Sequence, residues 1–210
     1  MKIKDLLPTV YNVADEAKVA CKGWYGRKNS RKLYTGKEKE KILTRNGEEI
    51  ATVCGRYYAV LAMEGTGYLK NRGRGPITVN WDGDYKYRIV DGCIYGEGVE
   101  RICLLPFHTI AADLKEHAVG KIIYVPRAKG LRLPDGTLHS GLFVVRDTGG
   151  AFIDIGPQRV DLFISSQTIE DNIFGKAGFD HHRPEEAYEV TGEKREEAIR
   201  FLQQKFGDLF

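Results

Sequence analysis

The chain has 210 residues, of which 42 % are hydrophobic, and its formal net charge is +3. This composition can bury a substantial core and is too apolar for a disordered chain. The small positive charge permits an anionic partner without demanding one, and we expect no nucleic-acid partner.

The first 41 residues are predicted to form a basic N-terminal arm. Leu6, Leu7, Val10 and Val13 lie near helical spacing, so we expect a short helix within residues 1–20, with a late start because of Pro8. Residues 22–45 are dense in lysine and arginine. A solvated arm is the simpler interpretation, and a patch that binds cell wall or nucleic acid is the alternative.

Residues 42–180 show short β segments separated by turn signals, and we predict one mainly β domain there. Residues 42–44 and 50–53 flank Asn46-Gly47, which is a strong hairpin signal. The later strand candidates are residues 57–63, 77–81, 85–90, 122–125, 142–146, 152–155 and 160–164. Many short strands with polar turns favour a barrel or a sandwich.

Residues 181–210 are predicted to form a helical tail. Between residues 193 and 206, Ala198, Ile199, Leu202 and Phe206 lie on one side of a helix and charged residues occupy much of the other. The tandem His181-His182 beside Asp180 suggests a metal ligand set. We expect a polar loop instead, because no further ligand spacing accompanies it.

The four cysteines and the N-terminus bear on redox state and location. Cys21, Cys54, Cys93 and Cys103 are widely spaced, so we expect four small core residues rather than disulfide partners or a metal site. Polar residues interrupt the N-terminal apolar stretch. We therefore expect no secretory signal and no membrane span within this sequence.

Three aspartates close or interrupt apolar, strand-like runs. Asp113 follows residues 109–112, Asp147 follows residues 143–146, and Asp161 lies inside residues 159–163. Burying an ionised carboxylate without a partner is so unfavourable that the group tends to stay protonated. Such positions favour tuned acids, and Gly149-Gly150 would let a substrate approach the backbone closely.

Five sequence blocks together resemble the 3D (Asp-Asp-Asp) domain. This family is related to membrane-bound lytic transglycosylase A and to the stationary-phase survival muralytic enzymes. The blocks run in the family's order between about residues 42 and 165, and they comprise NGEEIATV at 46–53, MEGTGYL at 63–69, LPFHTIAAD at 105–113, DTGGA at 147–151 and VDLF at 160–163.

The resemblance implies a double-psi β-barrel that cleaves the glycan strands of peptidoglycan without water and leaves 1,6-anhydro-muramyl ends. It makes Asp161 the catalytic acid, with Asp113 and Asp147 shaping its environment. It also places Glu64 and Thr66 in the substrate cleft. The resemblance implies no metal or organic cofactor and a site of action at the bacterial cell wall, reached through a virion or after removal of a leader.

One departure from the family pattern lies between Asp147 and Asp161, where the interval is a few residues longer. Residues 149–157 read GGAFIDIGP in place of a run beginning Gly-Gly-Ala-Ile-Lys-Gly. Either the loop between the two strands is longer, or Asp154 contributes to the site.

Other interpretations stay open at the level of sequence. Asp147-Thr148-Gly149 is also typical of an aspartic peptidase, which would have to dimerise to supply a second aspartate. The domain could instead be a non-catalytic glycan-binding or structural module, for example in a phage tail or a secretion apparatus. Structural roles compete as well, because Asp147 could accept backbone hydrogen bonds at the glycine turn and Asp113 could cap a helical turn.

Overall fold

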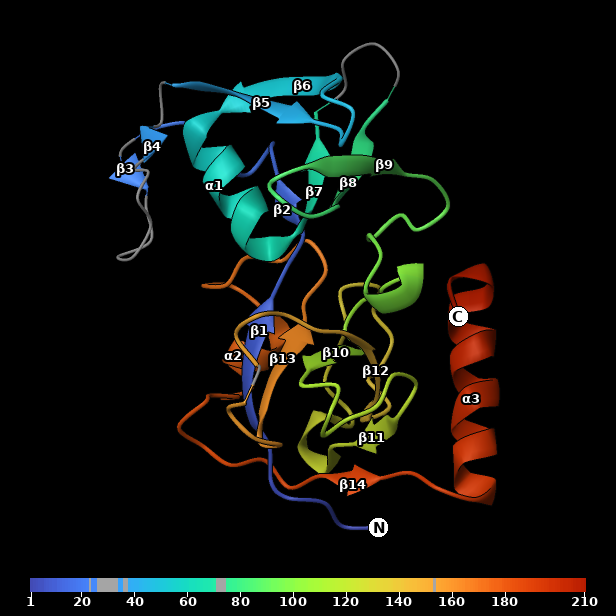
Figure 1. The fold of residues 1–210 in the computed structure, drawn as a ribbon. Helices are drawn as coiled ribbons and strands as arrows, with labels where there is room; N and C mark the ends of the chain where they lie inside the picture. Colours follow the sequence, from blue (N-terminus) through green and yellow to red (C-terminus); the bar gives the residue numbers. More distant parts are fainter. Residues whose placement is uncertain (23, 26–33, 36–37, 71–74, 153) are drawn as a thin grey trace. The chain divides into compact units, whose positions relative to one another are not determined.

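The computed structural model describes the chain except for residues 23, 26–33, 36–37, 71–74 and 153 (Figure 1). It divides into two compact units. Unit 1 comprises residues 1–12 and 97–210, and unit 2 comprises residues 13–96. The expected division into residues 1–41, 42–180 and 181–210 has other bounds, and it stays a prediction about domain organisation.

Unit 1 is built on a six-stranded sheet with the order β1-β13-β10-β12-β11-β14. These strands are β1 (Leu7–Tyr11), β10 (Thr109–Ala112), β11 (Ile122–Tyr124), β12 (Leu142–Asp147), β13 (Arg159–Phe163) and β14 (Tyr188–Glu189). The pairs β1·β13 and β10·β12 are parallel, whereas β10·β13, β11·β12 and β11·β14 are antiparallel. A mainly β fold is thus confirmed. The named strands pair in a linear order in which the two end strands, β1 and β14, do not pair with each other. The double-psi barrel therefore stays a prediction.

The core of unit 1 is supplied by strand residues that alternate between the core and the other face of the sheet. Ile110, Phe143, Val145, Val160 and Leu162 are all buried in one hydrophobic cluster. Three-residue 3-10 helices occur at Val99–Arg101, Pro126–Ala128 and Gly207–Leu209, and the short helix α2 spans Ile173–Lys176. These packed strands form the rigid base on which the acidic residues sit.

The C-terminal helix α3 (Glu193–Phe206) has the bounds expected from its amphipathic pattern. Its buried Ala198 and Leu202 pack with Ile122 and Val144 of the sheet, so α3 lies beside β11 and β12 (Figure 1). Among the described residues, no helix has the length and apolar character needed to cross a membrane.

Unit 2 combines small sheets with one helix. A four-stranded sheet has the order β2-β7-β8-β9, and two two-stranded sheets pair β3 with β4 and β5 with β6. The elements are β2 (Ala14–Asp15), β3 (Trp24–Tyr25), β4 (Tyr34–Thr35), β5 (Lys39–Leu43), β6 (Glu49–Cys54), α1 (Gly55–Glu64), β7 (Thr66–Leu69), β8 (Ile77–Trp81) and β9 (Tyr87–Val90). The Asn46-Gly47 hairpin is confirmed as β5·β6, with Gly47 at φ 83° as its turn requires.

Three expected elements are wrong. Residues 1–20 contain β1 and β2 rather than a helix, because Leu6 and Pro8 alternate with more exposed neighbours and β1 pairs with β13. Residues 57–63 belong to α1, where Tyr57, Tyr58 and Leu61 are buried at helical spacing. The described part of residues 152–155 forms turns, with Phe152 buried and Ile155 exposed.

The expectation for the cysteines is also wrong. Cys21 and Cys54 form a disulfide across 33 residues of unit 2, and no cysteine is free. Spacing along the chain could not identify this pair, because a disulfide depends on Cα atoms that folding brings close together. A disulfide of this kind persists in oxidising compartments such as the periplasm or the extracellular space.

Candidate functional site

Two of the predicted aspartates lie in one row across the sheet of unit 1. Ala111 of β10 pairs with Asp161 of β13 on one side and with Asp147 of β12 on the other. Asp161 in turn pairs with Thr9 of β1. Residues that pair directly across neighbouring strands project to the same face of a sheet. The sheet therefore brings Asp147 and Asp161 to one face.

The residue between the two acids is small. Neighbouring strands lie about 4.8 Å apart, so the backbones of Asp147 and Asp161 are separated by about 10 Å. Ala111 leaves the space above it to the flanking carboxyl groups. The register between β10 and β12 shifts between Ile110 and Ala111, and irregularities of this type re-aim side chains beside functional sites.

Asp147 carries a carboxyl group that is adapted to hold a proton near neutral pH. Burial raises its pKa to about 7, the Thr148 amide and the nearby Tyr11 hydroxyl act in the opposite direction, and the charge of Asp161 reinforces the effect of burial. The Thr148 N–H donates to Oδ1 of Asp147 over 2.8 Å. The Thr148 amide thus holds Asp147 in place, while desolvation keeps it a weak acid.

Asp161 is a second weak acid, and one of its carboxyl oxygens lacks a hydrogen-bond partner among the described residues. Burial raises its pKa to about 6, and the charge of Arg159 acts in the opposite direction. The nearest Arg159 nitrogen lies 3.7 Å from Oδ1, which is too far for a hydrogen bond. Oδ1 is buried and has no hydrogen-bond partner among the described residues. Leaving a buried oxygen without a hydrogen bond costs free energy, and a hydrogen bond with a reacting group would remove that cost.

Asp113 uses its carboxylate to hold the backbone. The Lys115 N–H donates to Oδ1 over 3.0 Å, and the Asp154 N–H approaches Oδ2 at 3.3 Å. The amides of Glu116 and His117 also bond to the Asp113 carbonyl, which closes one helical turn. These contacts agree with the helix-capping role that was one of the two interpretations of Asp113 from the sequence. This bonding also links Asp113 to Asp154, in the lengthened interval between the other two acids.

Gly149 and Gly150 form the turn that follows β12. The Phe152 N–H donates to the Gly149 carbonyl over 3.1 Å. A Cβ atom at Gly149 would touch the Phe152 ring at 3.4 Å, whereas a Cβ atom at Gly150 would meet nothing within 4 Å. The space beside Gly150 is therefore open. Its role toward a substrate stays a prediction.

Glu64 and Thr66 belong to unit 2. Glu64 is the last residue of α1, and Thr66 begins β7 after a turn at Gly65. Thr66 is 5 % exposed, and its Oγ1 bonds to the Asn80 side chain over 3.2 Å. Both residues are half-buried or buried within their own unit, and their role in a substrate cleft stays a prediction.

Two side chains near the acids were not found from the sequence. Thr9 and Tyr11 lie on β1, beside β13, and the Tyr11 ring packs on Phe163 with 5.1 Å between ring centroids. Thr9 Oγ1 is buried without a hydrogen-bond partner in the described part of the chain. The sequence feature that could have identified them is the run Thr9-Val10-Tyr11, whose β-branched and aromatic residues are typical of a strand.

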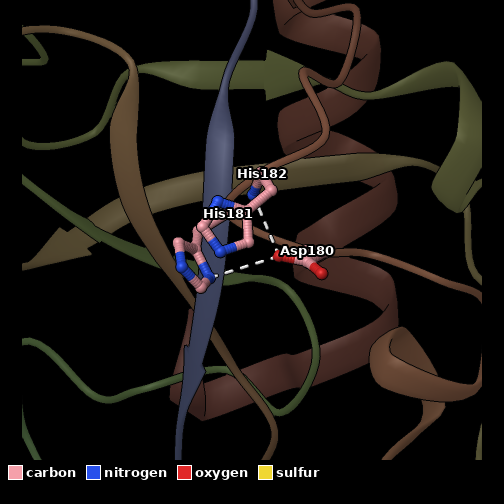
Figure 2. Close-up of side chains that lie close together, drawn as sticks. All are labelled: Asp180, His181 and His182. Atoms are coloured by element: carbon pink, nitrogen blue, oxygen red, sulfur yellow. Dashed lines mark hydrogen bonds and ion pairs between the residues drawn. The ribbon is translucent and has the colours of Figure 1, made fainter.

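The cluster of Asp180, His181 and His182 is exposed, and its ligand-type atoms lie within 4.8 Å of one another (Figure 2). The Asp180 carboxylate accepts the His182 N–H over 2.9 Å and lies 3.2 Å from Nδ1 of His181. The hydrogen bond from the His182 backbone N–H lowers the pKa of Asp180. These contacts close a short turn, and the interpretation of the three residues as a polar loop rather than a metal site stays a prediction.

Several solved structures of lytic transglycosylases are similar to this chain. E. coli MltA with bound chitohexaose is 10 % identical, with a TM-score of 0.49 over 88 % of this chain and 70 % of that one. The membrane-bound lytic murein transglycosylase of Agrobacterium tumefaciens is 14 % identical, with a TM-score of 0.48 over 95 % and 77 %. LtgG of Burkholderia pseudomallei is 12 % identical, with a TM-score of 0.42 over 86 % and 69 %. No curated protein matches the sequence.

The family comparison bears directly on the three aspartates. Residues 108–181 match the model of the 3D domain, and this segment contains Asp113, Asp147 and Asp161. The match confirms the resemblance seen in the sequence blocks. Residues 108–181 of this chain are therefore similar to the 3D domain.

Proposed function

We propose that the chain is a peptidoglycan lytic transglycosylase. It cleaves the β-1,4 bond between N-acetylmuramic acid and N-acetylglucosamine without water and leaves 1,6-anhydro ends. The observation that carries the proposal is the row Asp147-Ala111-Asp161 inside the segment similar to the 3D domain, with the pKa of both acids raised by burial.

Such a reaction can proceed with one principal carboxyl group. The acid protonates the oxygen of the leaving sugar, and the 6-hydroxyl of the muramyl residue attacks the anomeric carbon within the same molecule. The carboxylate then takes the proton from that hydroxyl, so no water and no second nucleophile are consumed. An ordinary glycosidase needs two carboxyl groups at a defined separation instead.

We assign the acid and base role to Asp161. Its Oδ1 has no hydrogen-bond partner in the described structure, so it can present a proton to a glycosidic oxygen. Asp147 accepts a hydrogen bond from the Thr148 amide, which suits a group that positions substrate, and the charge of Asp161 raises the pKa of Asp147. Asp113 supports the loop around Asp154.

The glycine turn after β12 would form part of the substrate site. The open space beside Gly150 would admit a sugar close to the backbone, and the turn at Gly149 would hold that backbone in position. For Glu64 and Thr66, in unit 2, polar contacts to the substrate stay a prediction from the sequence resemblance. No metal or organic cofactor takes part in this scheme, because proton transfer and positioning supply the catalysis.

We also propose that unit 1 closes as a double-psi β-barrel. Leu6 and Glu185 exchange two backbone hydrogen bonds of 2.8 Å, and an isolated bridge pairs Lys2 with Tyr188. These contacts join the segment before β1 to the segment around β14, which are the two ends of the strand order. The Cys21–Cys54 disulfide supports a site of action at the bacterial cell wall, in the periplasm or outside the cell.

Digestion of purified sacculi followed by mass spectrometry of the fragments tests the proposal. We expect anhydro-muropeptides from the wild-type protein and at least a hundredfold slower release from the Asp161→Asn variant, because general acid catalysis contributes about 10²–10⁴-fold. Asp208→Asn is the matched control, since Asp208 is exposed in the last 3-10 helix. Circular dichroism would verify that both variants fold.

Each other outcome points to a different function. Reducing ends would indicate a hydrolase, cleaved peptides would favour the dimeric aspartic peptidase, and the absence of any fragment would favour a glycan-binding or structural module. Undiminished release by Asp161→Asn would remove Asp161 from its proposed role.

A further inference from the structure

A groove of about 860 Å³ lies in unit 1 between α3 and the β11·β14 edge of the sheet. It is lined by residues of β11, β12, β14 and α3, and by Lys129 and Ser140 from the connecting segments. The paired acids Asp147 and Asp161 are not among its lining residues. A concave site of this size fits one or two sugar rings with their substituents, and it falls within the usual range for ligand pockets.

The floor of the groove is a row of three side chains on one face of the sheet. Tyr124 of β11 pairs with Leu142 of β12 on one side and with Tyr188 of β14 on the other. Directly paired residues project to the same face. Two tyrosine rings and a leucine thus form an apolar surface that is continuous across three strands.

Both tyrosine rings are held in position by their surroundings. The backbone of Gly141, at φ 84°, packs so closely on Tyr124 that a Cβ atom there would lie 2.6 Å from the ring. The Tyr188 hydroxyl donates to the Glu186 carboxylate over 2.6 Å. Rings that are fixed before binding lose little conformational entropy when a ligand stacks on them.

One helical face forms the wall of the groove. Lys194, Glu197 and Phe201 recur at the spacing of neighbouring side chains on α3. Phe201 is 37 % exposed, although Ala198 and Leu202 beside it are buried against the sheet. An exposed aromatic ring that lines the same groove as the two tyrosines adds a second apolar surface to it.

The charges on the rim favour an anion. Lys129 and Lys194 form no ion pair within the described residues, whereas the Glu189 carboxylate lies 3.6 Å from the Lys121 ammonium group. Glu197 is the one other carboxylate on the rim. Two lysines therefore face a single unneutralised acid, and a ligand carboxylate would find a net positive rim.

We propose that this groove is a second binding site for a carboxylate-bearing amino-sugar chain, distinct from the row of acids. The proposal rests on the proposed function, which supplies the polymer. The apolar faces of the sugar rings would lie on Tyr124, Tyr188 and Phe201, and a lactyl or peptide carboxylate would bind Lys129 and Lys194. Such a site would hold a glycan strand against unit 1 independently of its cleavage.

Site-resolved NMR titration of the Asp161→Asn protein tests the proposal. The probes are muramyl dipeptide, which carries one carboxylate, and chitotetraose, which carries none. We expect both probes to shift the backbone amides of residues 188–201, with muramyl dipeptide binding at least fivefold more tightly. Tyr188→Ala and Phe201→Ala should each weaken both probes at least fivefold, and Lys194→Gln should remove the preference for the charged probe.

Arg195→Gln is the matched control, because Arg195 is exposed on α3 and does not line the groove. It should leave both affinities unchanged. Phe201→Ala keeps the proposal testable if Tyr188→Ala fails to fold, since Phe201 is partly exposed on a helix.

Failure of this proposal differs from failure of the proposed function. Wild-type affinities in the groove variants, or shifts confined to residues that do not line the groove, would overturn the groove proposal even if sacculi are cleaved. Continued cleavage by Asp161→Asn would overturn the catalytic assignment without changing the binding data.

Discussion

A single alanine of β10, Ala111, lies between the two acids whose pKa is raised. Ala111 is 4 % exposed and pairs with Asp147 and Asp161 at once. The acids owe their raised pKa first to burial, and the charge of Asp161 adds to the effect on Asp147. At the scale of residues, the site thus depends on desolvated carboxyl groups whose protonation the fold controls.

Asp147→Asn should change how stability depends on pH. The folded-state pKa is raised from 3.8 to about 7, so the folded protein binds more protons than the unfolded chain between these values. Stability therefore falls as the pH rises from about 4 to about 7, by a few kcal/mol at most. The asparagine variant should lose less stability over this range. Urea unfolding at pH 4 and pH 7.5 measures the difference, and an unchanged difference would contradict the assignment.

Tyr11→Phe should raise the pKa of Asp147 further. The Tyr11 hydroxyl lowers the pKa of Asp147 and so favours the charged carboxylate, and the variant removes this hydroxyl. Carboxyl ¹³C shifts followed through a pH titration measure the effect. Tyr95→Phe, in unit 2, is a matched control that should leave the Asp147 titration unchanged. An Asp147 pKa that is equal or lower in Tyr11→Phe would show that this hydroxyl has no such role.

At the scale of elements, unit 2 depends on a close contact between α1 and β7. A Cβ atom at Gly67 would lie 2.4 Å from the Tyr57 hydroxyl and 2.7 Å from Cδ1 of Leu61, both on α1. The Tyr57 hydroxyl also bonds to the carbonyls of Ala14 and Tyr68. Glycine at position 67 lets the helix approach the strand and lets this hydroxyl reach both carbonyls.

Gly67→Ala should therefore destabilise the protein by about 1–3 kcal/mol, as overpacking of a filled core does. Gly150→Ala is the matched comparison, because a Cβ atom there meets nothing within 4 Å. Thermal unfolding of the two variants measures the contrast. Equal melting temperatures would mean that α1 can shift away from β7 at little cost.

The elements also show which sequence signals were sufficient. The Asn46-Gly47 hairpin and the helix Glu193–Phe206 were predicted, because a turn type and an amphipathic period are local properties. Residues 57–63 were assigned to a strand from their apolar composition. The buried positions Tyr57, Tyr58 and Leu61, followed by Gly65 at φ 79°, carried a helical signal that was missed.

At the scale of the whole molecule, stability at acid pH depends on a pair of buried histidines in unit 1. The rings of His108 and His139 stack with 4.3 Å between centroids. Burial lowers the pKa of His108 to about 3, with the charge of His139 acting in the same direction, and burial lowers the pKa of His139 to about 4. Both rings stay neutral in the folded protein well below pH 6.5.

His108→Phe should protect the protein from acid. Because the folded-state pKa lies below the unfolded value, the unfolded chain binds more protons and wild-type stability is lost as the pH falls below 6.5. By pH 4.5 this loss amounts to about 2 kcal/mol for His108. The difference between the unfolding free energies at pH 6.5 and 4.5 should shrink by about that amount in the variant, and His139 keeps its own share of the loss. His182→Gln, in the exposed turn, should retain the wild-type loss, and an equal loss in His108→Phe would exclude His108 as a source.

The sequence by itself determined the mainly β class, the C-terminal helix and the resemblance of residues 108–181 to the 3D domain, because composition, period and motif order are local properties of the chain. Only the tertiary structure decided which polar groups meet. The Asp147-Ala111-Asp161 row, its neighbours Thr9 and Tyr11 on β1, and the Cys21–Cys54 bond all join residues that are distant in sequence. Strand order and register bring such residues together, and these depend on how the whole core packs.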